Sequence, residues 1–441
     1  MEVFVKVSIV GAGLAGSEAA LQLAGSGVEV DLYEMRPGTM TPAHTTGLPA
    51  ELVCSNSLRS DLVHNAPGLL KEELRRCGSF LMKAADSCRV PAGGALAVDR
   101  EEFSNTVQEM LSSEKLITLI EKEVTEIPPG RVIIAAGPLA STSLTDALAK
   151  LTGSGALYFY DAIAPVVDFE SVNMDRAYFQ NRYETDTDTD SQADYLNCPF
   201  TEEEYFNFVY ELKEGERVST RDFEKEIHFQ GCMPVEAIAD SGDMSLAFGP
   251  MKPVGLVDPG TGARSFAVVQ LRMENRAGTA WNLVGFQTKL TYPEQKRVFR
   301  MIPGLEKAEF IRLGSMHRNT FINGPLLLDE RMQLKTDNRI VFAGQITGIE
   351  GYIESIASGY LAGVLMAGID ALPPSDTALG AVLRYPTETV TDNYQPSNIN
   401  YGLFPPMKKK PRGGRLARRE AQAERALKSL SEWLSAFSAE K

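Results

Sequence analysis

The amino-acid sequence predicts an α/β fold of Rossmann type that is interrupted by an inserted α+β domain and ends in a basic helix. The chain opens with an apolar strand, a glycine-rich loop and a helix, in that order. Two further apolar segments, at 131–135 and 339–343, have the composition of buried strands. Strands that are apolar at nearly every position are typical of a parallel sheet that helices cover on both faces.

The first strand is predicted at 3–10, and it leads into the loop GAGLAG at 11–16. The apolar spacing from 14 to 24 predicts a helix, and the next apolar run, at 28–33, predicts a second strand. A strand, a helix and a strand in this order form a βαβ unit, in which the two strands are parallel.

The middle of the chain differs in its amino-acid pattern from the segments on either side of it. This change predicts an inserted domain at 161–313. It contains an acidic, threonine-rich loop at 183–194, and Thr201 is suited to cap a helix that follows it. The other elements that we expect there are strands at 265–271 and 281–286 and a helix opened by Pro293. The main domain then comprises residues 1–160 and 314–441.

The end of the chain combines a long helix with a basic tail. The helix, rich in small residues, is predicted at 352–369, and the tail occupies 405–441. Between 408 and 428 the tail holds nine Lys or Arg and only two Glu, although the whole chain carries a net charge of −14. Such a local excess of positive charge indicates contact with phosphate groups, and the alternative is a helix whose charges simply face water.

Composition excludes several classes of protein. Of the 441 residues, 44% are hydrophobic and 23% are charged, as in globular proteins and unlike disordered or fibrous ones. No apolar run reaches the roughly 20 residues that cross a bilayer, and no basic leader precedes the first strand, so we expect a cytoplasmic protein without a membrane span. Five cysteines without a CxxC pair predict neither a disulfide framework nor a metal site.

The glycine loop predicts a dinucleotide-binding site. Gly11, Gly13 and Gly16 allow a tight turn and the close approach of a pyrophosphate to the start of the helix. Glu34 ends the second strand about twenty residues later, where its carboxylate can bond a ribose hydroxyl, as in FAD or NAD. The residues expected to bind the cofactor are Gly11, Ala12, Gly13, Gly16, Glu34, Met35, Arg36, Gly137, Gly344 and Gln345.

Two later segments favour FAD over NAD. RVIIAAGP at 131–138 and TDNRIVFAGQ at 336–345 resemble the strand-plus-glycine signatures of flavoproteins of the glutathione-reductase type. The second signature usually ends in Gly-Asp beside the ribityl chain, whereas Gln345 stands here in place of the acid. An amide can also bond a ribityl hydroxyl, so we expect a Rossmann-type FAD-binding domain.

Six motifs in one order give the chain a close resemblance to the TrmFO family of folate- and FAD-dependent tRNA (uracil-5-)-methyltransferases. They are GAGLAG, YEMRP at 33–37, ELVCSNSLRS at 51–60, FQGCMPVE at 229–236, FAGQITGIEGYIES at 342–355 and the basic tail. The resemblance covers about the whole chain, and the two cysteine-containing motifs are far more specific than the glycine loop.

The resemblance implies an activity, its cofactors and three site residues. Enzymes of this family take a one-carbon unit from 5,10-methylenetetrahydrofolate, reduce it with FAD that receives electrons from NAD(P)H, and place the methyl group on C5 of the T-loop uridine of tRNA. The family's two functional cysteines fall on Cys54 and Cys232, and its flavin-side tyrosine falls on Tyr352. We expect no obligate protein partner.

The chemistry of uracil is consistent with a cysteine nucleophile. Attack of a thiolate on C6 makes C5 reactive, and a helix start beside Cys232 would lower the pKa of its thiol. We therefore assign the covalent adduct to Cys232 and a second role to Cys54, as proton donor or acceptor or as a guard of the carried methylene. The alternatives are an inert buried thiol at Cys232 and a packing role for Tyr352. We expect His44 and His317 to be structural.

With tRNA as the implied substrate, the basic residues of the tail become candidate phosphate contacts, which position an RNA without reading its sequence. They are Lys408, Lys409, Lys410, Arg412, Arg415, Arg418 and Arg419. Two rival functions stay open at this point. One is a related flavoprotein that modifies the wobble uridine of tRNA together with a partner GTPase, and the other is an RNA-binding protein in which FAD is only structural.

Overall fold

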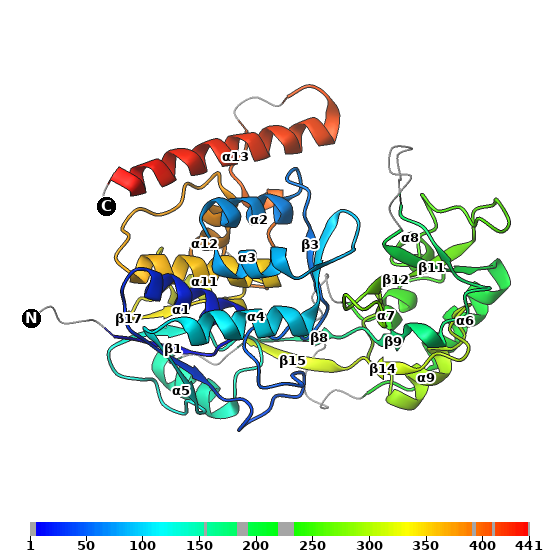
Figure 1. Cartoon of the computed structure of the whole chain (residues 1–441), viewed down its shortest axis with the longest axis horizontal. Helices are drawn as coiled ribbons and strands as arrows, with labels where there is room; N and C mark the ends of the chain where they lie inside the picture. Colours follow the sequence, from blue (N-terminus) through cyan, green and yellow to red (C-terminus); the bar gives the residue numbers. More distant parts are fainter. Residues whose placement is uncertain are drawn as a thin grey trace, which may run out of the picture.

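The computed structural model describes residues 6–153, 157–182, 193–218, 233–389, 394–407 and 411–439. These residues form two lobes, each with its own sheet and hydrophobic core, and a two-stranded connection runs between them (Figure 1). The first lobe consists of the described residues before 154 and after 321. The second lobe consists of the described residues from 163 to 315.

The first lobe is built on a sheet in the order β16-β17-β7-β1-β2-β6, in which only β16 runs antiparallel to its neighbour. The strands are β1 (Val7–Val10), β2 (Val30–Glu34), β6 (Ile117–Glu121), β7 (Arg131–Ile134), β16 (Gln333–Leu334) and β17 (Asp337–Phe342). The predicted βαβ opening and the two later parallel strands are thus confirmed. The ends of β2, β7 and β17 differ from the predicted ends by at most two positions. Strand β1 begins at Val7, whereas the predicted start at 3 lies outside the described residues.

Helices cover both faces of this sheet, as its apolar strands require. On one face α1 (Leu14–Gly25) packs against α11 (Tyr352–Met366), and on the other lies α5 (Thr142–Thr152) (Figure 1). The face of α1 and α11 also carries α2 (Ala66–Arg76), α3 (Phe80–Ser87), α4 (Arg100–Ser113) and α12 (Ala378–Glu388). Helix α11 ends before the predicted 369 because Gly368 adopts a φ of +103°, which stops a helix.

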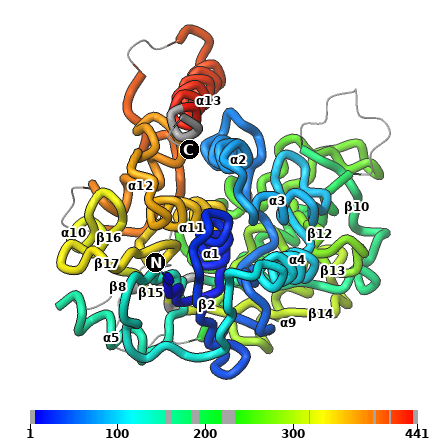
Figure 2. The backbone as a smooth tube through the Cα atoms, turned by 60° about the vertical axis from the view of Figure 1, so that its left-hand side comes forward, coloured from blue at the N-terminus to red at the C-terminus, as the bar shows by residue number. Residues whose placement is uncertain are grey.

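The C-terminal helix α13 (Gly414–Ala439) lies over α2, on the side away from the sheet (Figures 1 and 2). Its later turns are anchored, because Ala426 and Leu430 are buried and Nε1 of Trp433 donates to the carbonyl of Ala371 at 3.3 Å. Earlier in the chain, the short helix α10 (Gly324–Leu327) forms a single turn. The end of the chain therefore packs on the first lobe and covers α2.

The second lobe is built on an antiparallel sheet in the order β10-β11-β12-β13-β9-β14. Its strands are β9 (Val166–Asp168), β10 (Tyr178–Phe179), β11 (Tyr195–Phe200), β12 (Ala267–Met273), β13 (Ala280–Leu283) and β14 (Phe310–Arg312). Strand β13 stops short of the predicted 286, and Gly285 turns the chain there with a φ of +77°. Four helices pack on it in the described residues: α6 (Glu202–Glu214), α7 (Val235–Asp240), α8 (Ser245–Phe248) and α9 (Tyr292–Phe299).

Two helix starts of this lobe follow their predicted signals. The hydroxyl of Thr201 accepts from the N–H of Glu204, and the Glu204 carboxylate bonds back to the N–H of Thr201, which caps α6. Pro293 lies in the first turn of α9, where its missing N–H is not needed.

The chain enters and leaves the second lobe through neighbouring strands. Strand β8 (Leu157–Ala162) pairs antiparallel with β15 (Met316–Phe321), and Figure 1 shows both between the lobes. The predicted limits of the inserted domain, 161 and 313, lie at or beside these strands and stay a prediction. Beside them the first lobe has a small sheet of β3 (Ser57–Ser60), β5 (Ala95–Val98) and β4 (Arg89–Val90). In the part of the chain that the structure describes, no helix has the length and hydropathy of a membrane span.

Candidate functional site

Close backbone contacts shape the glycine loop between β1 and α1. Gly11 has a φ of +100°, and a Cβ there would lie 2.6 Å from the carbonyl oxygen of Ala135. A Cβ at Gly16 would lie 1.8 Å from the carbonyl oxygen of Gly11. Both positions therefore require glycine, and the helix can begin directly behind the strand.

Gly13 has different surroundings, because a Cβ there would meet no atom within 4 Å. Gly13 is also the N-cap of α1, and no side chain bonds the free N–H groups at this helix end. Such N–H groups and the helix dipole together favour an anion, for example a pyrophosphate. The loop thus offers both the space and the donors that a dinucleotide requires.

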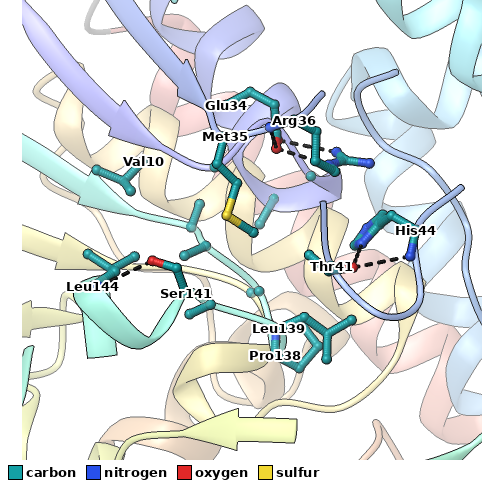
Figure 3. Close-up of a pocket in the computed structure, with 18 of the residues that line it drawn as sticks. Val10, Glu34, Met35, Arg36, Thr41, His44, Pro138, Leu139, Ser141 and Leu144 are labelled. Carbon is teal, nitrogen blue, oxygen red and sulfur yellow. Dashed lines mark hydrogen bonds and ion pairs between the residues drawn. The ribbon is translucent and has the colours of Figure 1, made fainter. Parts of the chain in front are cut away.

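The carboxylate of Glu34 ties the end of β2 to this loop. Its Oε2 accepts a hydrogen bond from the N–H of Ala12 at 3.0 Å. Its Oε1 accepts from Nε of Arg36 at 2.9 Å (Figure 3). The backbone N–H and Nη2 of Arg36 add bonds of 3.1 and 3.2 Å, so the roughly four lone-pair positions of the carboxylate are all used. A ribose hydroxyl would have to replace a bond to Arg36, and ribose binding by Glu34 stays a prediction.

The charges of the cleft follow from burial and from Arg36. Burial alone would raise the pKa of Glu34, but the hydrogen bonds and charge of Arg36 outweigh it and hold this pKa below its usual value. Burial, together with the charge of Arg36, lowers the pKa of His44 to about 4. At neutral pH His44 is therefore uncharged, with Nδ1 lying 2.6 Å from the hydroxyl of Thr41.

These groups line a single cleft with a cavity volume of about 130 Å³. Figure 3 shows Glu34, Met35 and His44 around it, with Pro138 and Leu139 on the opposite wall. Eight predicted cofactor-binding residues line this cleft: Gly11, Gly13, Glu34, Met35, Arg36, Gly137, Gly344 and Gln345. The other two do not line the cleft but support the loop: the N–H of Ala12 donates to Glu34, and Gly16 packs against Gly11.

The cleft extends from the end of β17 to the start of α11. Gly344 follows β17 with a φ of +79°, and the amide of Gln345 donates to the carboxylate of Glu350. Tyr352, the first residue of α11, also lines the cleft. The helix predicted to begin beside the cofactor therefore does begin at the wall of the cleft.

Tyr352 connects the cleft to Cys54. Its hydroxyl accepts hydrogen bonds from the N–H of Cys54 at 2.7 Å and from the N–H of Ser55 at 3.3 Å. Burial raises the pKa of Tyr352, so the phenol keeps its proton. The Cys54 thiol is partly exposed, and its Sγ lies 3.7 Å from the carbonyl oxygen of Ala162 on β8. The structure thus brings these two predicted site residues together, while their roles stay predictions.

Two arginines from opposite lobes hold the backbone before Cys54. Arg100, at the start of α4, donates to the carbonyl of Leu52 at 2.6 Å and pairs with Glu274 of the second lobe at 2.5 Å. Arg312 of β14 donates to the carbonyl of Val53 at 3.3 Å. The loop that carries Cys54 therefore lies at the junction of the lobes.

Four predicted site residues lie outside the described residues: Cys232, Lys408, Lys409 and Lys410. The nearest described helix after Cys232 is α7, which begins at Val235 with Pro234 as its N-cap, so a helix start at Cys232 stays a prediction. At the start of α13, Arg412, Arg415 and Arg418 are exposed. Arg419 is half-buried, and its Nη1 donates to Oδ1 of Asn65 on the first lobe at 2.9 Å. This structural contact of Arg419 was not foreseen from the sequence.

The remaining cysteines and histidines have packing environments. Burial raises the pKa of Cys77 and of Cys198 to about 12, and Cys88 is also buried. His317 is buried with Nε2 lying 2.9 Å from the hydroxyl of Ser315. His44 lines the cleft, and its expected structural role stays a prediction. The described residues include no cluster of His, Cys, Asp or Glu suited to hold a metal ion.

Sequence reasoning missed the loop residues of the cleft and the arginines of the junction. Thr41 and Ser141 line the cleft, yet they lie outside the motifs named above, and Glu51, the first residue of ELVCSNSLRS, lines it without having been assigned a role. Arg100 and Glu274 are 174 positions apart in the chain, so no local spacing could connect them.

Three comparisons place the chain among known proteins. A family model described as glucose inhibited division protein A matches residues 6–369. The methylenetetrahydrofolate–tRNA-(uracil-5-)-methyltransferase TrmFO of Geobacter sulfurreducens is 58% identical over 440 residues, covering 97% of this chain and 99% of that protein. The protein of the same name from Syntrophotalea carbinolica is 55% identical over 433 residues, covering 97% and 93% of the two chains.

Among solved structures, GidA of Aquifex aeolicus superposes with a TM-score of 0.67. The match covers 97% of this chain and 73% of that one, at 16% sequence identity. At this identity the likeness shows a shared fold.

Proposed function

The chain belongs to the TrmFO family, and we propose that it methylates C5 of a uridine in tRNA, with 5,10-methylenetetrahydrofolate as the carbon donor. The finer parts of the proposal are that the uridine is that of the T-loop, that FAD is bound and acts as reductant with electrons from NAD(P)H, and that a cysteine forms an adduct with C6.

The cleft of the first lobe fits FAD. Open space lies beside Gly13, and the free N–H groups of α1 point to where a pyrophosphate would lie. Glu34, Arg36, Gly344 and Gln345 line the same cleft. These residues would hold the cofactor. When bound, FAD supplies the reducing electrons for the one-carbon unit.

One observation carries the proposal: Tyr352 lines the cofactor cleft and also holds the backbone of Cys54 with its hydroxyl. A cysteine is therefore placed at the border of the cleft, at the junction with the second lobe. Cys232 lies outside the described residues, and in the sequence it stands between α6 and α7. The proposed reaction would thus take place between the lobes.

The proposed adduct works through the electrons of the uracil ring. The sulfur of Cys232 bonds to C6, and the electron pair of the C5–C6 double bond moves toward the C4 oxygen as an enolate, which makes C5 a nucleophile. After C5 has bonded the methylene carbon, loss of the C5 proton and cleavage of the bond between that carbon and its carrier would leave an exocyclic methylene at C5. A hydride equivalent, whose electrons bound FAD would supply, would reduce this methylene to the methyl group as the S–C6 bond breaks and releases the thiolate. Cys54 is the second cysteine of this scheme.

An assay of the product tests the activity. The purified protein is incubated with NADH, 5,10-methylenetetrahydrofolate and unmodified tRNA, and the nucleosides are identified by mass spectrometry. We expect 5-methyluridine at the T-loop position without any added protein. A carboxymethylaminomethyl uridine that requires a GTPase would identify the wobble-modifying rival, and tRNA binding without any new nucleoside would identify the non-catalytic one.

A second assay tests the nucleophile. RNA that contains 5-fluorouridine has no C5 proton to lose, so the covalent complex accumulates. We expect the wild type and Cys54→Ala to form this complex and Cys232→Ala to form none. An undiminished complex in Cys232→Ala would remove that residue from the nucleophile role.

A further inference from the structure

Strand β3 runs from the junction of the lobes toward the first turns of α13 (Figure 1). Just before the strand, Nδ2 of Asn56 donates to the carbonyl of Met273 in the second lobe at 2.9 Å. At its end, the hydroxyl of Ser60 accepts from Nδ2 of Asn65 at 2.9 Å, and Asn65 in turn binds Arg419 of α13. The strand therefore connects the lobe junction with the basic helix.

Arg59 lies in a bulge of this strand. Ser57 and Ser60 pair with Ala97 and Ala95 of β5, so three steps along β3 match two steps along β5. Within the bulge Arg59 has a φ of +68°, which residues other than glycine rarely adopt. Such strain persists only where the surrounding structure enforces it, and bulges beside active sites re-aim a side chain. The backbone of β3 is thus strained at the residue whose side chain it directs.

One buried carboxylate holds the guanidinium of Arg59. Nη1 donates to Oε1 of Glu354 at 2.9 Å, and the Glu354 side chain is completely buried, whereas 41% of the Arg59 side chain is exposed. The same oxygen accepts the N–H of Ile399 at 3.0 Å, which helps to fix the carboxylate. Among the described residues, Nε and Nη2 of Arg59 have no hydrogen-bond partner, and both reach solvent. The guanidinium is therefore anchored on one side and can donate to a second anion.

The first turn of α11 fixes the place of Arg59 relative to Cys54. The hydroxyl of Tyr352 accepts the N–H of Cys54 at 2.7 Å, and Glu354, two residues further along the helix, holds Arg59. Neither Arg59 nor Glu354 lines the cofactor cleft, so the second anion is not the cofactor. Arg59 lies instead between Cys54 and the exposed arginines of α13, where a nucleic acid that touches both would pass.

We propose that Arg59 binds a phosphate of the tRNA substrate, between the phosphates bound by the start of α13 and the uridine beside Cys54. This inference rests on the proposed function, which makes an RNA the substrate. Phosphate oxygens suit the two free donors of the guanidinium, and Glu354 keeps the guanidinium oriented toward them. Such a contact positions the RNA at the lobe junction without reading its sequence.

The salt dependence of tRNA binding tests this contact. The dissociation constant of the full-length protein for unmodified tRNA is measured by filter binding over a range of salt concentrations, without folate or NADH. Arg59→Gln should raise this constant about tenfold, as expected for the loss of a hydrogen bond between charged groups. It should also flatten the slope of log affinity against log salt by about 0.9, the share of one phosphate. Arg59→Lys keeps the charge and should keep the slope.

The matched control is Arg76→Gln, at the last residue of α2. The Arg76 side chain is 42% exposed and also forms an ion pair, with Glu72 at 2.9 Å. Its replacement should leave the dissociation constant and the slope near the wild-type values. An unchanged slope in Arg59→Gln, or an equal flattening in Arg76→Gln, would overturn the proposal.

A double variant separates RNA contact from a structural role of the ion pair. Arg59→Gln alone leaves the buried carboxylate of Glu354 without its cation, which weakens the fold. Combining it with Glu354→Gln removes both charges, keeps the net charge and retains an acceptor for Ile399. We expect stability in urea to recover toward the wild type, while the slope stays flatter by about 0.9. Recovery of the wild-type slope would show that Arg59 acts only by neutralising Glu354.

Folate also carries carboxylates, and steady-state kinetics distinguish this source of anion. We expect Arg59→Gln to raise the KM for tRNA and to leave the KM for 5,10-methylenetetrahydrofolate unchanged. A raised KM for the folate together with an unchanged salt slope would assign Arg59 to the folate and overturn the proposal. Because the binding assay contains no folate or NADH, its outcome is independent of methyl transfer, and a failure of the proposed reaction would be seen separately.

Discussion

At the scale of single residues, the site depends on side chains that serve two neighbours at once. Glu34 fixes the glycine loop through Ala12 and orients Arg36 at the rim of the cleft. Tyr352 forms part of the cleft wall and holds the loop of Cys54. Replacing such a residue affects the shape of the cleft and the position of a functional group together.

Tyr352→Phe should show this coupling. It leaves the N–H groups of Cys54 and Ser55 without their acceptor, so we expect a loss of about 1–3 kcal/mol in the free energy of unfolding. We also expect methyl transfer to fall at least tenfold while tRNA affinity stays unchanged. The measurements are denaturant unfolding, single-turnover methylation and filter binding.

The matched control for this variant is Tyr205→Phe in the second lobe. The hydroxyl of Tyr205 likewise accepts a backbone N–H, from Ala247 at 3.1 Å, and donates to the carbonyl of Asp243. Its loss should cost similar stability and leave methyl transfer intact. Equal loss of methyl transfer in both variants would show that Tyr352 acts only through stability.

The glycine loop and Glu34 could be predicted from the sequence because their geometry is local. The turn, the helix start and the end of the next strand lie within one motif, and backbone sterics dictate where glycine is required. Arg312 and Glu274 could not be predicted in this way. Arg312 bonds the backbone before Cys54, and Glu274 bonds Arg100, only because the second lobe folds back against the first, and no spacing in the chain encodes these contacts.

At the scale of elements, helix ends supply most of the chemistry of the site. Helix α1 offers uncapped N–H groups beside Gly13, and α11 begins at the cleft with Tyr352. Helix α13 combines two functions along its length, since its first turns expose arginines and its later turns pack on the first lobe. The exposed arginines are therefore the ones to test for RNA contact.

Replacing Arg412, Arg415 and Arg418 with Gln should weaken tRNA binding without unfolding the protein, because all three are exposed. If each contacts one phosphate, the slope of log affinity against log salt should flatten by up to about 2.7. Arg425→Gln is the control on the same helix. Its guanidinium is held by the carbonyl of Pro405 at 3.0 Å, so it should alter stability more than the salt slope. If the triple variant kept the wild-type slope, the arginines of the tail would not contact RNA, and the helix would be one whose charges simply face water.

The contact between α2 and α12 should make stability depend on pH. The carboxyl of Glu73 on α2 is fully buried and accepts the N–H groups of Ala378 and Leu379 at the start of α12, both at 2.8 Å. Burial raises the pKa of Glu73 to about 8. Between roughly pH 5 and 8 the folded state therefore binds a proton that the unfolded state has lost, and this contribution to stability falls as the pH rises.

Glu73→Gln removes this titration while keeping a hydrogen-bond acceptor. Compared with the variant, the wild type should lose stability between pH 5 and 8 by up to about 1.4 kcal/mol per pH unit. Urea unfolding at several pH values measures the difference. If the difference in the free energy of unfolding between wild type and variant does not change with pH, Glu73 is ionised in the folded protein and the prediction is wrong.

At the scale of the whole molecule, two lobes meet at the loop that carries Cys54. The strands β1, β2, β7 and β17 and the helices α1 and α11 of the first lobe could be predicted, because apolar strands and glycine turns are recognisable from the local sequence. The other elements of this lobe, such as β6, α4 and α5, were not predicted. The packing of the second lobe against β3, β5 and α4 could not, because it rests on contacts such as Asn56 with Met273 at 2.9 Å, which join distant segments. The proposed reaction requires that packing.

The most direct test of this account follows the transferred carbon. The protein is incubated with tRNA, NADH and 5,10-methylenetetrahydrofolate labelled with ¹³C in the methylene group, and the product nucleoside is analysed by mass spectrometry. We predict 5-methyluridine that carries the label in its methyl group. Unlabelled 5-methyluridine, or a labelled product at another position of the uridine, would contradict the central claim.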